Sequence, residues 1–158
     1  MNYSVTYFSS PIGLLRIMGK KSALMKIEFV QNAGNDSIDE EQLQLAVQQL
    51  DEYFAGERKE FSLPLHPEGT HFQMNVWEQL QQIPFGKTVS YEDIARKLGD
   101  IKVIRAAATA NGRNPLPIVI PCHRVIGKDG TLTGYSGGLW RKKWLLDFEM
   151  REIQPKLL

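Results

Sequence analysis

The residues best suited to covalent chemistry lie between positions 114 and 125, where the chain carries its only cysteine, Cys122. This residue follows an apolar run and Pro121, and His123 comes directly after it. A thiol attacks as its thiolate, and histidine, arginine or a helix N-terminus can lower its pKa. A lone cysteine beside a histidine is therefore a candidate nucleophile.

The same segment also fits a structural role. A free cysteine at the end of an apolar run can be a small buried core residue, since free cysteine is among the most buried residue types. A single histidine such as His123 is often a hydrogen-bonded structural residue. From these residues alone, both interpretations of Cys122 stay open.

Length and composition bound the class of protein. A chain of 158 residues suits one domain, or one main domain with a small appendage, and can bury a real core. One cysteine excludes an intrachain disulfide and favours a reducing compartment. The first residues do not resemble a signal peptide, and no apolar run approaches the roughly 20 residues of a membrane span. These features predict a soluble, cytoplasmic protein that does not enter a membrane.

The net charge of +1 hides an uneven distribution. Residues 1–95 carry 7 Lys and Arg against 13 Asp and Glu, a net of −6, whereas residues 96–158 carry 12 against 5, a net of +7. A basic half that contains the cysteine indicates a polyanionic partner such as nucleic acid. A solvated basic face without a partner is the alternative.

The first part of the chain has the pattern of an antiparallel sheet followed by a helix. Three β-prone runs at 4–8, 14–18 and 24–30 are separated by turn residues. Apolar residues at helical spacing predict a helix over 38–54. The proline-bearing connection that follows, 57–70, holds the expected boundary between an α/β domain, residues 1–66, and a second domain, residues 67–158.

The second domain reads as mainly helical. Thr70 and Ser90 can each cap a helix, a third helix is expected from about 102 to 111, and a last one over about 138–150. In the last helix, the apolar side is expected to carry Leu139, Trp140, Trp144 and Phe148. Short helices joined by a glycine-containing turn indicate a helix-turn-helix.

The third expected helix has an unusual composition. Within residues 103–110, Arg105 is the one long cation, and small residues, mostly alanine, follow it. Small side chains permit close approach to a nucleic-acid groove, and a single long side chain can enter between base steps. Alanine also suits ordinary packing against a core, so both interpretations stay open for this helix.

Several motifs together resemble one protein family, the O6-alkylguanine-DNA alkyltransferases, also called methylated-DNA–protein-cysteine methyltransferases. The resemblance covers about residues 69–150 in register and is carried by Gly-Thr-His-Phe-Gln at 69–73, Ile-Pro-Phe-Gly-Lys-Thr-Val-Ser-Tyr at 83–91, Arg-Ala at 105–106, Asn-Pro at 114–115, Ile-Pro-Cys-His-Arg-Val at 120–125, Gly-Tyr-Ser-Gly-Gly-Leu at 134–139 and Trp-Leu-Leu at 144–146 with Glu149. It implies an α/β (α+β) fold, in which a small N-terminal antiparallel sheet with a helix, RNase H-like, precedes a mainly helical domain with a helix-turn-helix.

The resemblance also implies a reaction. A member of this family binds double-stranded DNA, flips an alkylated guanine out of the duplex, and moves the alkyl group from O6 irreversibly to the cysteine, here Cys122. By analogy, O4-alkylthymine is a possible further substrate. After the apolar run, the segment at Cys122 and His123 is expected to be extended, and adjacent residues of an extended segment point to opposite sides, so no direct contact between the two is expected. His123 would take the thiol proton through a water molecule, Glu149 would orient His123, and Asn114 would brace the turn. No cofactor or metal is expected, and the protein is expected to act as a monomer.

The resemblance assigns further residues to the substrate and the DNA. Tyr91 and Ser136 would donate to the purine, Gly137 would line the same site, and the carbonyls of Cys122 and Val125 would accept from the exocyclic amine. Arg105 would fill the gap left in the base stack. The expected DNA-binding residues are Arg105, Ala106, Ala107, Thr109, Ala110, Arg113 and Arg124.

The chain departs from the family pattern in two places. Ala107 and Ala108 stand where valine and glycine are common, which could alter the fit to the groove. The structural zinc of some members cannot be built, because the chain has one cysteine and three histidines. Two other functions fit parts of the pattern: a lesion-binding module without catalysis, which would not need the cysteine, and a cysteine hydrolase, which would turn over repeatedly.

Overall fold

The structure is a computed structural model and describes residues 2–154. The chain divides into two compact units, which meet between Glu68 and Gly69, two residues beyond the expected boundary. No helix in the described part is long and apolar enough to cross a bilayer.

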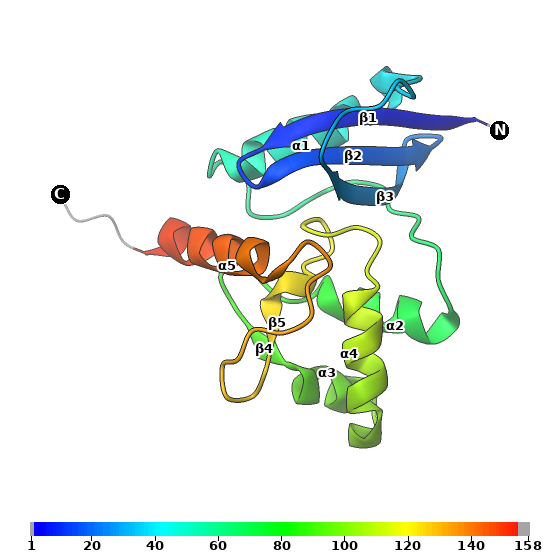
Figure 1. The fold of residues 1–158 in the computed structure, drawn as a ribbon. Helices are drawn as coiled ribbons and strands as arrows, with labels where there is room; N and C mark the ends of the chain where they lie inside the picture. The colour runs from blue at the N-terminus through cyan, green and yellow to red at the C-terminus, as the bar shows by residue number, and fades with distance from the viewer. Residues whose placement is uncertain (1, 155–158) are drawn as a thin grey trace. The chain divides into compact units, whose positions relative to one another are not determined.

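The first unit is built on the expected antiparallel meander. Strands β1 (Tyr3–Ser10), β2 (Gly13–Lys20) and β3 (Ala23–Val30) pair in the order β1-β2-β3 (Figure 1). The second hairpin turns at Lys21 and Ser22, whose φ angles of 52° and 68° are those of a two-residue turn that matches the twist of the strands.

The helix expected over 38–54 begins later than its apolar spacing suggested. Ile38 instead pairs with Val5, through backbone hydrogen bonds of 2.9 and 3.0 Å. A 3-10 turn, η1 (Glu40–Leu43), then leads into α1 (Gln44–Phe54). Bonding to the edge of the sheet therefore takes precedence over local helix propensity at residue 38.

The core of this unit lies between the sheet and α1 (Figure 1). Leu15, Ile17 and Ile27 of the strands are buried, as are Leu50 and Tyr53 of α1. The alternation of buried residues along β2 is the pattern of a sheet with one face on a core.

The second unit begins with two capped helices. Thr70 caps α2 (His71–Leu80) and Ser90 caps α3 (Tyr91–Lys97), each in a reciprocal capping box with the residue three positions later. Each box satisfies two helix-terminal N–H groups, which explains why both helices start where the sequence predicts.

A glycine turn joins α3 to the next helix and completes the helix-turn-helix. Gly99 has a φ of 91°, a conformation that L side chains rarely adopt. A short 3-10 turn, η2 (Ile101–Val103), then leads into α4 (Ile104–Gly112). The predicted third helix is therefore present, with its first turn in 3-10 form.

The remaining elements of this unit connect the cysteine to the last helix. A 3-10 turn, η3 (Cys122–Arg124), is followed by β5 (Val125–Ile126), which pairs in parallel with β4 (Val89–Ser90). The last helix, α5, spans Leu139–Ile153. The β4–β5 pair has only two residues per strand, too few for a recognisable alternation, so no sequence pattern predicts it.

Candidate active site

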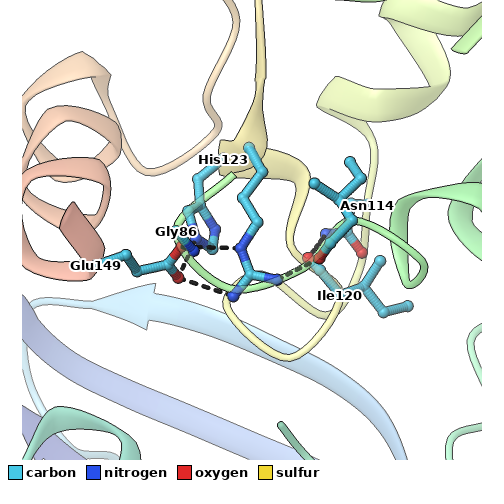
Figure 2. A network of polar contacts seen from close by, with 7 residues as sticks. Gly86, Asn114, Ile120, His123 and Glu149 are labelled. Atoms are coloured by element: carbon cyan, nitrogen blue, oxygen red, sulfur yellow. Dashed lines mark hydrogen bonds and ion pairs between the residues drawn. The ribbon is translucent and has the colours of Figure 1, made fainter. Parts of the chain in front are cut away.

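A tightly bonded loop between α4 and η3 positions the cysteine. The Nδ2 of Asn114 donates to the carbonyl of Ile120 at 2.8 Å (Figure 2). Its Oδ1 accepts from the backbone N–H of Leu116 at 3.0 Å. Within this loop, Ile118 has a φ of 77°, an uncommon and strained conformation for a β-branched residue. The loop is therefore held in one shape from within, and Asn114 bonds both of its sides.

The backbone at Cys122 is a 3-10 turn, not the extended segment expected from the apolar run before it. Cys122 is buried, with 4% of its surface exposed. No direct hydrogen bond joins its Sγ to the imidazole of His123 in the described residues. The expected lack of direct contact thus holds, although the backbone conformation behind that expectation was wrong.

The imidazole of His123 is fixed by a carboxylate from α5. Its Nε2 lies 2.8 Å from Oε2 of Glu149, and both side chains are buried (Figure 2). The Nδ1 of His123 is buried and has no hydrogen-bond partner among residues 2–154. An imidazole held at one nitrogen by a carboxylate can accept a proton at the other, as in acid–histidine–nucleophile triads.

Arg124 occupies a different place from the one expected of a DNA contact. It is 6% exposed, its Nε and Nη2 each lie 2.9 Å from a carboxylate oxygen of Glu149, and its Nη1 donates to the carbonyl of Ile83 at 2.6 Å. A buried guanidinium bound on both edges of its fork is not available to a phosphate. The expected DNA contact of Arg124 is therefore replaced by a role in holding Glu149.

Burial and the contacts among His123, Arg124 and Glu149 determine the charge states of His123 and Glu149. Burial opposes the charge of Glu149, but hydrogen bonds and charges from His123 and Arg124 outweigh it and hold the pKa of this carboxyl well below its usual range. Burial is the main factor that lowers the pKa of His123, and Glu149 offsets part of that effect. We therefore expect a neutral imidazole beside an ionised carboxylate at neutral pH.

The thiol is protonated in the resting protein. Burial raises the pKa of Cys122 to about 11, against smaller lowering effects of Asn114 and of the ammonium of Lys142. Buried thiols are unreactive without help. Cys122 therefore needs a nearby base to become a nucleophile, and His123 is the buried imidazole next to it in the chain.

Lys142 is a functional candidate that the sequence analysis missed. It is fully buried and its Nζ donates to the carbonyl of Thr133 at 2.7 Å and to the hydroxyl of Tyr91 at 3.5 Å. Burial lowers the pKa of this ammonium, while Cys122 acts to raise it. A fully buried lysine is rare without a partner, so its contact with Tyr91 places it at the expected substrate site.

The face of α5 that is buried explains why Lys142 was missed. Leu139 and Trp140 were expected on the apolar side but are 49% and 57% exposed. Lys142 and Glu149, seven residues apart, lie on the buried side with Leu145. The available signal was the helical spacing of Lys142, Leu145 and Glu149, which places a lysine and a glutamate on the same face of the helix as a buried leucine.

The other expected substrate residues come from the start of α3, from β5 and from the loop before α5. The hydroxyl of Tyr91 lies 3.2 Å from the carbonyl of Thr133, in the loop that leads to Ser136. Ser136 is exposed and Gly137 is buried, while Val125 is fully buried in β5. The structure therefore connects Tyr91 with the 133–137 loop through Thr133 and Lys142.

The expected DNA-binding residues of α4 separate onto two faces. Arg105, Ala106 and Thr109 are exposed on the helix, as is Arg113 just beyond it. Ala107 and Ala110 are 1% and 2% exposed and pack inward, so no groove can reach them. For these two alanines the structure corrects the expectation of DNA contact in favour of core packing.

No group of three or more metal-binding side chains gathers anywhere in residues 2–154. In the buried network of His123, Arg124 and Glu149, the one carboxylate is that of Glu149. Since a guanidinium already neutralises that carboxylate, the network has no oxygen ligand left for a cation.

Comparison with known proteins covers both units. Residues 3–67 match the family model described as 6-O-methylguanine DNA methyltransferase, ribonuclease-like domain, and residues 71–151 match the DNA binding domain of the same family. A methylated-DNA–protein-cysteine methyltransferase of Methanosarcina acetivorans is 43% identical over 94% of this chain and 98% of its own. The constitutive enzyme of Bacillus subtilis is 45% identical over 99% and 100%.

Solved structures agree with this relationship. The O6-methylguanine methyltransferase of Mycobacterium tuberculosis has a TM-score of 0.85 at 39% identity, covering 98% of this chain and 96% of that one. The same organism's protein in complex with DNA has a TM-score of 0.86 at 42% identity, covering 96% and 94%. With both family models matched in order along nearly its whole length, the chain belongs to the O6-methylguanine-DNA methyltransferase family.

Proposed function

We propose that this protein repairs DNA by transferring an alkyl group from O6 of guanine to Cys122 in a single turnover. The observation that carries the proposal is the buried arrangement of Cys122, His123 and Glu149, in which the imidazole is fixed at Nε2 and open at Nδ1. Relatives named for this reaction align with 94% and 99% of the chain. A lesion-binding module would not need a buried base beside its cysteine.

The proton must leave the thiol before the alkyl carbon is attacked. In the proposal, it passes to Nδ1 of His123 through a bridging water, and Glu149 stabilises the imidazolium that forms. The Sγ–carbon bond forms as the carbon–O6 bond breaks, and guanine departs neutral after taking a proton from the hydroxyl of Tyr91. That hydroxyl regains its proton from solvent as the imidazolium of His123 releases the proton it took from the thiol. The thioether that remains has no leaving group, so each molecule acts once.

The base is bound by groups that approach its edge. Tyr91 and Ser136 donate to the purine, and Lys142 supplies a positive charge behind the Tyr91 hydroxyl. A cation that donates to a phenolic oxygen polarises the O–H bond, and the hydroxyl then donates more strongly. Lys142 thus serves two steps, since its charge also favours the thiolate of Cys122.

Arg105 is proposed to occupy the base stack when guanine is flipped out. Replacing it (Arg105→Ala) is expected to reduce transfer from duplex DNA by about 10- to 100-fold, because flipping costs a few kcal/mol that an inserted side chain offsets. Transfer from the free base O6-methylguanine should not change. Rates are compared by quenched-flow sampling of methylated protein.

The matched control for this variant is Lys102→Ala, which removes another exposed cation of the same region. It should weaken DNA binding modestly and in a salt-dependent way, as a phosphate contact does. Equal losses for Arg105→Ala on duplex and on free base would contradict the proposed insertion.

The rate of transfer should depend on pH through His123. Because the pKa of His123 lies below its usual value of about 6.5, the imidazole stays neutral and able to accept a proton through neutral pH. The single-turnover rate is therefore expected to be flat near pH 7 and to fall only in more acidic solution. A fall centred above the usual histidine value would show that another group is the base.

The proposed function is tested by exposing the protein to a tenfold excess of duplex DNA with one O6-methylguanine per duplex. Nucleosides are then digested and guanine is quantified. The proposal predicts one restored guanine per protein molecule, followed by no further repair. Restoration beyond one equivalent would indicate a hydrolase, and DNA binding without restoration would indicate a lesion-binding module.

The protein is further proposed to act as a monomer in the cytoplasm. The reduced state that a nucleophilic thiol requires supports this location.

A further inference from the structure

A buried amide of α4 lies against the backbone of the nucleophile. Asn111, in the last turn of α4, is 2% exposed, and its Nδ2 donates to the carbonyl oxygen of Cys122 at 3.4 Å. This contact sets the orientation of the amide, because turning it over would place two oxygens against each other.

The other end of the same amide has no donor. The Oδ1 of Asn111 is buried and accepts no hydrogen bond from any group in residues 2–154. Most buried polar atoms are hydrogen-bonded, and leaving an acceptor unsatisfied costs free energy. A buried oxygen held in place beside the reactive cysteine is suited to accept a hydrogen bond from a ligand.

The carbonyl oxygen of Cys122, beside this amide, is a poor acceptor for a further hydrogen bond from a ligand. The oxygen of Cys122 already accepts from the backbone N–H of Val125, in the 3-10 turn, and from Nδ2 of Asn111. A carbonyl oxygen has two lone pairs, so both are used before a substrate arrives. An N–H of the substrate that approaches this carbonyl needs another acceptor close by.

We propose that Oδ1 of Asn111 accepts a hydrogen bond from the exocyclic amine of the flipped guanine and so helps to select guanine. This inference rests on the proposed function. The amine carries two hydrogens, one for Oδ1 of Asn111 and one for the carbonyl of Val125. Guanine offers this donor on its minor-groove edge and thymine does not. Asn111 thereby connects the helix that carries Arg105 with recognition of the base.

The test compares two substrates in the full-length protein. Single-turnover rates of methyl transfer are measured for duplexes with O6-methylguanine or with O6-methylhypoxanthine, which lacks only the 2-amino group. For the wild type, we expect guanine to react about tenfold faster, because the amine makes two hydrogen bonds that each contribute roughly threefold. For Asn111→Leu, similar in size but without an acceptor, this ratio should shrink to about two- to threefold.

Two further variants separate recognition from folding. Asn111→Ala, which leaves space instead of a new apolar surface, should show the same reduced ratio if Asn111→Leu does not fold. Val76→Ala, in the core of α2 and fully buried, should keep the wild-type ratio even if the protein becomes less stable.

An unchanged ratio in the Asn111 variants would overturn the inference, and so would a wild type that reacts equally with both substrates. A wild type that transfers from neither substrate would overturn the proposed function itself, and the inference with it.

Discussion

Replacing Cys122 with serine (Cys122→Ser) is expected to abolish alkyl transfer completely while leaving DNA binding intact. A hydroxyl is far less acidic than a thiol and is a weak nucleophile without strong activation. The side chain changes by a single atom and is buried, so the loop held by Asn114 should keep its shape. Transfer is measured with DNA carrying a radiolabelled methyl group, and binding by electrophoretic mobility.

Folding of this variant is checked by thermal unfolding, which should shift by only a few degrees. Serine in an apolar site brings a polar group that needs a partner, which costs about 1–3 kcal/mol at most. Labelled protein recovered from Cys122→Ser would contradict the assignment of the nucleophile, because the chain contains no other thiol.

Replacing Arg124 with methionine (Arg124→Met) is expected to lower the free energy of unfolding by a large amount. The change leaves the carboxylate of Glu149 buried with the loss of its bidentate partner. Removing one member of a buried ion pair typically costs about 3–5 kcal/mol of unfolding free energy. Chemical denaturation monitored by tryptophan fluorescence measures this loss.

Arg124→Met should also change the chemistry. The positive charge of Arg124 helps to lower the pKa of His123, so its removal should raise that pKa. The imidazole would then need a higher pH to be neutral, and the acid limb of the rate profile should move to higher pH. A merely structural role of Arg124 would lower stability without moving this limb.

The matched control is Arg96→Met, which breaks an exposed ion pair with Glu92 one helical turn away. Exposed pairs at this spacing contribute about 0.3–0.5 kcal/mol. If Arg124→Met also retained nearly full stability and binding of DNA fell instead, the original expectation of a DNA contact would be correct.

The sequence predicted most of the fold because its local signals agree. The reciprocal capping boxes at Thr70 and Ser90 mark helix starts whatever surrounds them, and the turns after β1 and in the α3–α4 connection follow their glycine or proline residues. Where tertiary contacts decide, the sequence misled: Ile38 joins the sheet edge, and the 3-10 turn at Cys122 follows an apolar run that looks extended.

The candidate site was predicted where a local motif carries it, and was missed where tertiary contacts decide. His123 and Glu149 were paired from the motif, and the structure brings them within 2.8 Å. The burial of Arg124 and the role of Lys142 depend on which face of α5 packs inward. The spacing of apolar residues predicted a face with Leu139 and Trp140, but the buried face carries Lys142 and Glu149. A charged residue on a buried face is invisible to a rule that looks only for apolar spacing.

The central claim, that Cys122 itself receives the alkyl group, is tested most directly by mass spectrometry. The wild-type protein is incubated with a duplex containing one O6-methylguanine, weighed intact, digested and sequenced by fragmentation. The account predicts one added methyl group per molecule, located on Cys122, in equal amount to the guanine restored in the DNA. An unchanged mass, or a methyl group on any other residue, would contradict it.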